Sequence, residues 1–360
     1  MQALHIHAGP RALTHIREHG LQPEHVGVIP AAAGGPKGLI LGPLDRFIFG
    51  QWLPPSKQPV HLVGASIGAW RMATACLKDP VAAFERLEHD YIHQHYELPA
   101  GQKKVTAEQV SREFGRNLAL FYGGRIAEVL SHPRYRLHVL TSHGRHLLGR
   151  EHPVGTPLGY AVAYLSNAVS RPALGAWLER AVFSSQGTLP FGTQDFRTRQ
   201  HPLTTANFMP AVQASCSIPF VLQAVHDIPG AAPGAYWDGG ITDYHLHLDW
   251  QTPQDRPEGR IVLYPHFQRQ VVPGWLDKAL RWRHGPTPYL DTTVVLAPNP
   301  EWVKTLPNAK LPDRKDFGTY GQDLQARVKV WSAAAAAAGQ LADEWAEWLA
   351  RPDLSRVQPL

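Results

Sequence analysis

The chain has 360 residues, of which 44% are hydrophobic and 18% are charged, so it is neither a disordered chain nor a coiled coil. A net charge of +5 over this length is too small to indicate a nucleic-acid partner, and we expect none. Two cysteines, Cys76 and Cys216, give neither a disulfide framework nor a zinc motif, and no apolar run suits a signal peptide or a membrane span, so we expect a cytoplasmic protein.

Strands and helices alternate in the first part of the sequence. The apolar runs at residues 25–30 and 61–65 predict buried strands. Each is followed by a turn that contains glycine and then by a helical pattern, at 36–49 and 67–78 respectively. Gly42-Pro43 predicts a break in the first of these helices. This order of elements is typical of a parallel sheet.

The rest of the chain is predicted to be less regular. We expect mainly helix over 80–131 with loops at 99–101 and 123–124, a strand over 135–141, a broken helix over 158–183, a polar loop over 186–202, a short helix over 208–217, and strands over 261–264 and 292–296. The clearest helix is at 322–349, which contains six consecutive alanines. Residues 229–233 and 253–259 are predicted to be loops rather than linkers. We therefore expect one domain over 1–360, in which the C-terminal strands and the helix 322–349 pack on a motif-bearing core at about 25–245.

The segment Gly64-Ala65-Ser66-Ile67-Gly68 fits the pattern G-x-S-x-G. It lies where a predicted strand ends and a predicted helix begins, which is the context in which this pattern carries a nucleophilic serine. The glycines allow the sharp turn that lifts Ser66 above the sheet, and the helix N-terminus favours the negative charge that develops during acyl transfer. The alternative is a structural turn made of small residues.

A second glycine-containing turn, Ala32-Ala33-Gly34-Gly35-Pro36-Lys37-Gly38, also follows a strand and opens a helix. Residues with small side chains let backbone N–H groups approach an oxyanion closely. The alternative is a phosphate-binding loop, although neither of the common nucleotide-binding glycine patterns is present. Far downstream stands Asp238-Gly239-Gly240, which on its own is more often a turn than a catalytic acid.

Taken in order, these segments resemble the patatin-like phospholipases, together with a fourth at residues 211–220, Ala-Val-Gln-Ala-Ser-Cys-Ser-Ile-Pro-Phe. The resemblance covers roughly residues 25–245. It implies a three-layer α/β/α sandwich with a mainly parallel central sheet. It also implies a serine esterase that hydrolyses carboxylic esters of phospholipids, lysophospholipids or related acyl lipids, with no metal or organic cofactor.

The resemblance further implies a dyad in which Ser66 attacks the ester and Asp238 accepts its proton. The N–H groups of Gly34, Gly35 and Ile67 would hold the oxyanion. Supporting loop positions would be Lys37, Gly38, Gly64, Gly68, Gly239 and Gly240. Lys37 would either tie down its loop or meet an anionic head group.

The glycine loop departs from the family pattern, which often opens with Asp-Gly-Gly-Gly: here the loop reads Ala32-Ala33-Gly34-Gly35, so Ala33 stands at the first glycine position. A positive φ would be costly for alanine, so we expect the loop geometry to differ there.

Two other functions remain open. One is a catalytically silent protein of the same fold that binds lipid or a protein partner. The other is a Ser-His-Asp esterase that uses a histidine such as His245. If residues 245–249 form a strand, His245, His247 and Asp249 share one face, which is either a solvated edge or a metal site.

The segment 272–284 is basic and contains two tryptophans. If it is helical, Trp275, Lys278 and Trp282 lie near one face. It then either makes transient contact with an anionic membrane surface or packs against the core. The sequence does not indicate an oligomeric state.

Overall fold

The computed structural model describes residues 1–98, 101, 105–251 and 258–360. The predicted loops at 99–101 and 253–259 lie largely outside these residues. One mixed, mainly parallel sheet runs through the molecule, in the order β11-β1-β10-β9-β2-β3-β4-β5-β6, with β8 paired to β4 and β7 to β8. Its strands are β1 (Leu4–Ala8), β2 (Val26–Ala31), β3 (Val60–Ala65), β4 (Tyr135–Gly144), β5 (Leu178–Ser184), β6 (Thr198–Pro202), β7 (Val225–His226), β8 (Ala235–Asp238), β9 (Ile261–Pro265), β10 (Thr293–Pro298) and β11 (Val357–Pro359).

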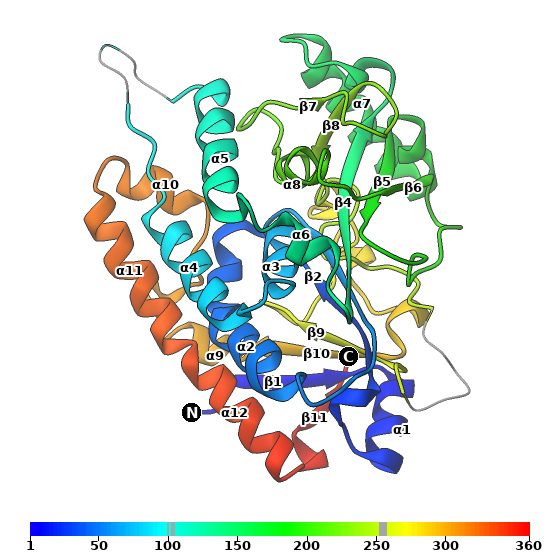
Figure 1. Ribbon diagram of the computed structural model, residues 1–360, viewed down its shortest axis with the longest axis vertical. Helices are drawn as coiled ribbons and strands as arrows, with labels where there is room; N and C mark the ends of the chain where they lie inside the picture. The colour runs from blue at the N-terminus through cyan, green and yellow to red at the C-terminus, as the bar shows by residue number, and fades with distance from the viewer. Residues whose placement is uncertain (99–100, 102–104, 252–257) are drawn as a thin grey trace.

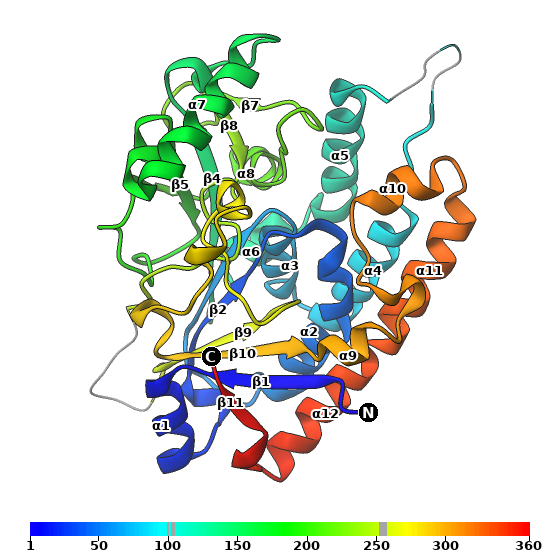
Figure 2. The ribbon, with the colours of Figure 1, turned by 180° about the vertical axis from the view of Figure 1, so that it is seen from behind.

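Helices lie around this sheet. They are α1 (Pro10–His19), α2 (Gly42–Phe47), α3 (Ile67–Ala75), α4 (Pro80–His93), α5 (Ala107–Tyr122), α6 (Ile126–Leu130), α7 (Gly155–Val169), α8 (Phe208–Ser215), α9 (Pro300–Val303), α10 (Lys315–Tyr320), α11 (Leu324–Ala337) and α12 (Gly339–Ala350). In Figure 1, α2, α3, α4, α11 and α12 lie together on the near side of the strands. Seen from behind in Figure 2, the segments that follow β9, coloured yellow, cross the opposite side. The expected α/β fold with a mainly parallel sheet is confirmed. Among the described helices, none has the length and apolar character that crossing a bilayer requires.

The register of the central strands brings the predicted motifs together. Parallel pairing of β2 with β3 sets Ala31 beside Gly64, so the glycine loop and the serine turn leave the sheet at the same edge. Parallel pairing of β3 with β4 sets Ala65 beside Leu140. β8 runs antiparallel to β4 and sets Asp238 beside Thr141, the residue after Leu140. The end of β8 is therefore close to the end of β3.

Most of the predicted strands and several of the predicted helices are confirmed. β2, β3, β4, β9 and β10 lie at the predicted strands, and α3, α4, α5, α6 and α8 lie within the predicted helical regions. The predicted break at Gly42-Pro43 is present, because a 3-10 helix at Gly35–Leu41 ends there and α2 begins. The strands β1 and β8 were not predicted, since each is short, and the ten-residue helix α1 was not predicted either.

The prediction of a helix over 158–183 is wrong in its last part, where α7 is followed by β5. The strand forms because β4 supplies an antiparallel partner, and because its charged residues are neutralised inside the protein. Arg180 is fully buried and bonds to Asp195 and Asp243. The predicted loop over 186–202 also contains β6, which pairs with β5.

Three further expectations are corrected. The predicted helix 322–349 is two helices, α11 and α12, that meet at Ala338, just before Gly339. Residues 245–249 are not a strand, because Leu246 has a φ of +49° and the chain turns there. The segment 272–284 is not one helix but contains two single 3-10 turns, at Trp275–Asp277 and Arg281–Arg283.

Candidate active site

Ser66 occupies a strained turn between β3 and α3. Its φ of +57° and ψ of −130° lie outside the regions that side-chain-bearing residues normally adopt. Such a conformation costs about 1–3 kcal/mol and persists only where the surroundings impose it. The turn is the strand-to-helix elbow expected for G-x-S-x-G. It leaves Ser66 only 6% exposed, at the N-terminus of α3.

Asp238 is the hydrogen-bond partner of Ser66. The Ser66 hydroxyl donates to Oδ2 of Asp238 at 2.8 Å, across 172 residues of sequence. The other carboxylate oxygen, Oδ1, accepts a hydrogen bond from the N–H of Gly240 at 2.7 Å. Both carboxylate oxygens are therefore held, and one of them points at the serine.

The environment of Asp238 makes it a stronger base than an ordinary aspartate. The side chain is buried, and this desolvation raises its pKa from 3.8 to about 6. The hydrogen bonds from Ser66 and Gly240 and the charges of Arg314 and Lys278 act in the opposite direction, but they are smaller. At neutral pH Asp238 is ionised and has a pKa closer to that of a useful general base.

Ser215 holds the backbone around this pair. Its hydroxyl accepts a hydrogen bond from the N–H of Ser66 at 2.9 Å and donates to the carbonyl of Leu140 at 2.6 Å. Its own carbonyl accepts from the N–H of Gly239 at 3.1 Å. Ser215 thus links the serine turn, β4 and the loop after Asp238. The sequence placed Ser215 in the fourth matching segment but assigned it no role.

The glycine loop lies beside Ser66 as predicted from the order of strands. Gly34 lines a small cavity together with Ser66 and Asp238, and Gly35 and Ile67 line a larger one that also reaches Ser66. Among the described residues, none accepts a hydrogen bond from the N–H groups of Gly34, Gly35 or Ile67. These three donors are therefore available to a ligand.

The loop tolerates the two alanines that depart from the family pattern. The positive φ in this loop occurs at Gly35, at +58°, and not at Ala32 or Ala33. Ala33 instead donates its N–H to the carbonyl of Tyr244 at 2.9 Å. The expected cost of a positive φ at alanine therefore does not arise.

Several of the predicted supporting glycines leave no room for a side chain. A Cβ at Gly68 would lie 1.9 Å from the carbonyl oxygen of Ala31, and one at Gly239 would lie 2.1 Å from that of Leu140. A Cβ at Gly64 would meet the backbone of Ala69 at 2.5 Å, and one at Gly240 would lie 2.6 Å from the Cβ of Ala33. A Cβ at Gly38 would make only ordinary contacts, the nearest at 3.5 Å. The close approach of β2, β3 and β4 at the site depends on the first four glycines.

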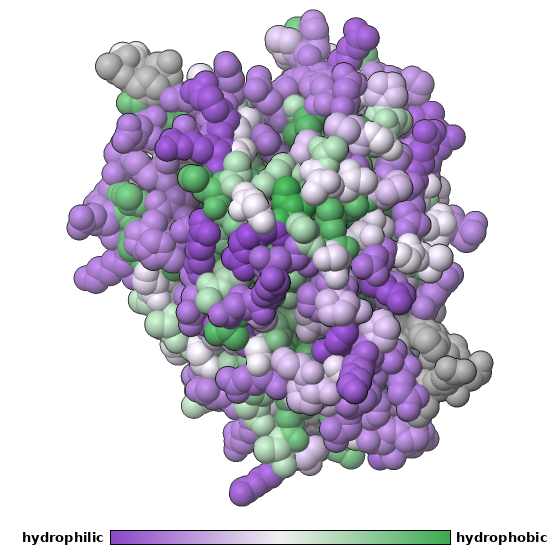
Figure 3. All heavy atoms as spheres, in the orientation of Figure 1, coloured by the Kyte–Doolittle hydropathy of each residue, from purple (hydrophilic) through white to green (hydrophobic). Residues whose placement is uncertain are grey.

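Two cavities meet at Ser66. The smaller cavity contains Ser66 and Asp238, and Gly34, Tyr244, Trp275 and Arg314 also line it. The larger cavity has a volume of about 560 Å³ and is lined mainly by apolar and aromatic side chains. Among these are Trp70, Tyr91, Tyr96, Val110, Phe114, Ile218, Val221, Leu222 and Phe317. Figure 3 shows hydrophobic residues gathered on this face around α8, between α5 and α7.

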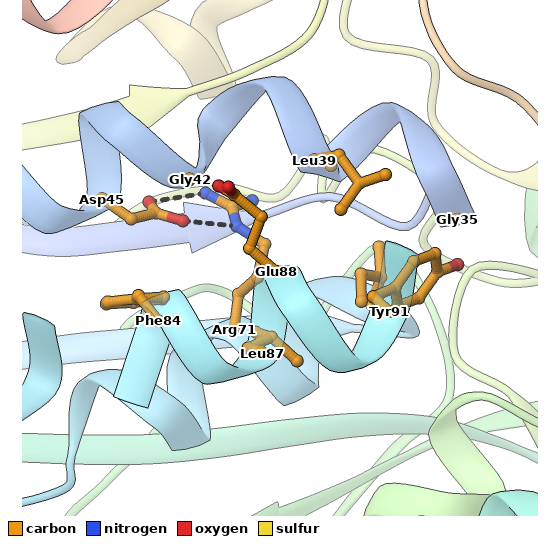
Figure 4. Close-up of a pocket in the computed structure, with 11 residues that line it drawn as sticks. Gly35, Leu39, Gly42, Asp45, Arg71, Phe84, Leu87, Glu88 and Tyr91 are labelled. Atoms are coloured by element: carbon orange, nitrogen blue, oxygen red, sulfur yellow. Dashed lines mark hydrogen bonds and ion pairs between the residues drawn. The ribbon is translucent and has the colours of Figure 1, made fainter. Parts of the chain in front are cut away.

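A buried ion pair connects the two helices, α3 and α2, that follow Ser66 and the glycine loop. Arg71 of α3 donates two hydrogen bonds of 2.7 Å to the carboxylate of Asp45 in α2. Figure 4 shows this pair in a small pocket that has Gly35 at its other end. The pair joins the helix that follows Ser66 to the helix that follows the glycine loop. Removing one partner of such a pair typically costs about 3–5 kcal/mol.

His245 and His247, which the sequence offered as a triad histidine or as metal ligands, make no hydrogen bond to Ser66. The ring of His245 bonds with the backbone of Gln270 and Val272, and that of His247 with the backbone of Val271 and with Thr287. In the described part of the chain, no group of three or more His, Cys, Asp or Glu side chains is arranged to hold a metal ion. His245, His247 and Asp249 therefore do not form the common face that a strand would have given them.

Lys37 lies in the 3-10 helix Gly35–Leu41, at the end of the glycine loop. Its ammonium group is 5.1 Å from the centre of the Phe267 ring, and burial lowers its pKa. Arg314 and Lys278 also lie near the site, and the sequence gave no signal for Arg314, which lies far from every motif.

A comparison with models of known protein families gave a match that includes the residues of this site. A family model described as patatin-like phospholipase matches residues 33–245, which is more than half of the chain and includes the glycine loop, Ser66 and Asp238. Neither the curated proteins nor the solved structures gave a match. On the family match, the chain belongs to the patatin-like phospholipases, a family of lipid acyl hydrolases.

Proposed function

We propose that this protein hydrolyses carboxylic esters of acyl lipids through an acyl-enzyme on Ser66. The observation that carries the proposal is the 2.8 Å hydrogen bond from the hydroxyl of Ser66 to a buried Asp238. In the first step the serine oxygen forms a bond to the ester carbonyl carbon while Asp238 takes the serine proton. The bond to the alcohol then breaks, and Asp238 returns the proton to the leaving oxygen.

In the second step Asp238 activates a water molecule instead of the serine. A water gives its proton to Asp238 as its oxygen attacks the acyl-enzyme carbonyl, the bond to Ser66 breaks, and the proton returns to the serine. In both steps negative charge develops on the carbonyl oxygen. The unengaged N–H groups of Gly34, Gly35 and Ile67 support the proposal that they stabilise this charge.

The larger cavity fits the acyl chain. Its volume of about 560 Å³ lies within the range of small-molecule sites, and its lining is predominantly apolar. The cavity begins at Ser66 and runs between α4, α5 and the C-terminal segment around Phe317. An acyl chain placed there would leave the alcohol part of the ester near the smaller cavity.

We further propose that the whole chain is one domain that makes transient contact with lipid surfaces. Strands β1, β9, β10 and β11 lie outside the matched region, yet they belong to the same sheet, which supports one domain. Trp282 is 74% exposed beside the exposed Arg281, a combination that favours anionic membrane surfaces, whereas Arg283 is paired with Asp277 at 2.9 Å. Sedimentation with anionic vesicles should recover wild type but less of a Trp282→Ser variant.

Hydrolysis of a medium-chain p-nitrophenyl ester tests the dyad. Wild type should be active, whereas Ser66→Ala and Asp238→Asn should be folded and lose activity by at least about 1,000-fold. Both variants keep the size of the original side chain nearly unchanged, so loss of activity would not reflect lost packing. If wild type is inactive on this ester and on acyl lipids, the protein is instead a catalytically silent member of the family. Activity that survives in Asp238→Asn would contradict the dyad.

A further inference from the structure

Exposed apolar side chains gather on one helix, α7. Leu158, Leu165 and Val169 are 53%, 63% and 86% exposed, and Val154, which precedes the helix, is 70% exposed. Their spacing of four, seven and four residues places them along one face of the helix. Of the thirteen large hydrophobic side chains that are exposed in the described part of the chain, six lie between Leu147 and Val169. Single exposed apolar residues are ordinary, whereas a group of them marks an interaction site.

The charges in and around α7 favour an anionic partner. The helix itself contains no charged residue. From Arg145 to Arg171 the sequence has three arginines and a single acidic residue, Glu151. Arg150, close to the start of the helix, is exposed. An uncharged apolar face flanked by cations is the pattern of a helix that lies in the interface of an anionic bilayer.

The C-terminal end of α7 lies beside the exposed Trp282. Nη2 of Arg283 donates a hydrogen bond to the carbonyl of Ala168, in the last turn of α7, at 3.3 Å. This bond holds the 3-10 turn Arg281–Arg283, which carries Trp282, against the end of the helix. The tryptophan therefore adds to the apolar face of α7 instead of forming a separate contact.

The segment after α8 connects α7 with the larger cavity. Tyr160, on the buried face of α7, meets the ring of Phe220 edge-on, with the ring centres 6.0 Å apart. Phe220 is 61% exposed and has a φ of +68°, which a bulky residue adopts only where its surroundings impose it. Its neighbour Val221 is also exposed and lines the cavity that reaches Ser66. Apolar side chains therefore lead from α7 to this cavity, and Figure 3 shows hydrophobic residues on this face between α5 and α7.

We propose that this surface enters an anionic lipid bilayer, so that an acyl chain passes from the bilayer into the larger cavity without crossing water. The α7 surface is defined by Val154, Leu158, Leu165, Val169, Phe220, Val221 and Trp282. This inference rests on the proposed function and names the partner of the same site. A bilayer fits better than a second copy of this chain, because a copy seated there would cover Val221 and the cavity that it lines.

Vesicle binding tests the surface without any turnover. The protein carries Ser66→Ala, so the lipid stays intact, and it is sedimented with vesicles of phosphatidylcholine and phosphatidylserine. Adding Leu158→Ser and Leu165→Ser should weaken binding at least about 10-fold, because two apolar side chains that would enter the bilayer are lost. The matched control adds Leu120→Ser and Leu354→Ser, which remove two exposed leucines elsewhere, and should bind as before. All four leucines are exposed, so both proteins should fold.

Activity assays separate this inference from the proposed function. With Ser66 present, the ratio of the rate on vesicle phospholipid to the rate on a soluble p-nitrophenyl ester should fall at least about 10-fold in Leu158→Ser/Leu165→Ser and stay unchanged in the control. If no ester is hydrolysed but vesicle binding depends on the two leucines, the proposed function fails and the α7 surface stands.

Three results would overturn the inference. One is a wild type that does not bind the vesicles, and another is vesicle binding that the two serines leave unchanged. The third is a wild-type dimer that the two serines convert to a monomer without an effect on vesicle binding, which would identify the face as an interface between copies of this chain.

Discussion

Replacing Asp238 by asparagine should stabilise the protein while it abolishes activity. Burial raises the pKa of Asp238 from 3.8 to about 6, so ionising this carboxyl opposes folding. The cost is absent below about pH 4, where the carboxyl is protonated in both states, and fully present above about pH 6. The difference between 3.8 and about 6 corresponds to about 3 kcal/mol of unfolding free energy.

Asparagine would remove this cost with little loss of contacts. Its amide oxygen can still accept from the N–H of Gly240, and its amide group can donate to the oxygen of Ser66, where the carboxylate now accepts. Asp238→Asn should therefore raise the free energy of unfolding at pH 8 by up to about 3 kcal/mol. A functional group held in an unfavourable environment lowers the stability of the folded protein, so replacing that group is expected to raise the stability.

Denaturation with urea at a series of pH values is the assay. The stability gained by Asp238→Asn should be largest at pH 8 and should shrink as the pH falls from 6 to 4. Asp343→Asn, which removes an exposed aspartate of α12, controls for the general effect of losing one carboxylate. A gain that does not depend on pH, or a loss of stability at pH 8, would refute the argument that desolvation sets the pKa of Asp238.

Further predictions follow from the same contacts. The kcat/KM for a neutral ester should fall as the pH drops through about 6, because Asp238 must be ionised to accept a proton; a pH–rate profile flat from 7 to 5 would be inconsistent with this. Ser215→Ala removes the acceptor for the N–H of the proposed nucleophile and should cost about 1–3 kcal/mol of stability, measured by denaturation, together with a loss of kcat. Gly68→Ala would force a Cβ to 1.9 Å from the carbonyl oxygen of Ala31 and should cost several kcal/mol or prevent folding. Gly339→Ala, whose Cβ would meet nothing within 4 Å, should be neutral or slightly stabilising, and thermal melting of the two glycine variants checks both predictions.

The family and the relative placement of its motifs could be predicted because each motif is a local turn. A G-x-S-x-G turn after a strand needs only the strand, the two glycines and the following helix, all of which are readable from about ten residues around Ser66. The position of Asp238 was inferred from the resemblance alone. The structure gives its physical basis in the register of β8 on β4, which sets Asp238 beside Thr141.

Features that depend on distant partners could not be predicted. β5 has a polar start that looks like a helix break, and it forms because Arg180 finds Asp195 and Asp243 far along the chain. Arg314 reaches the site from a loop near the C-terminus and belongs to no pattern. The turn at Leu246, which separates His245 from His247, likewise has no signal in the sequence.

Covalent labelling tests the central claim most directly. A fluorophosphonate probe reacts with a serine oxygen only when that oxygen is activated and an oxyanion site is present to receive the phosphonyl oxygen. Digestion and mass spectrometry of labelled wild type should find one adduct, on Ser66, and labelling should be lost in Ser66→Ala and strongly slowed in Asp238→Asn. An adduct on another residue, or none on folded wild-type protein, would contradict the account.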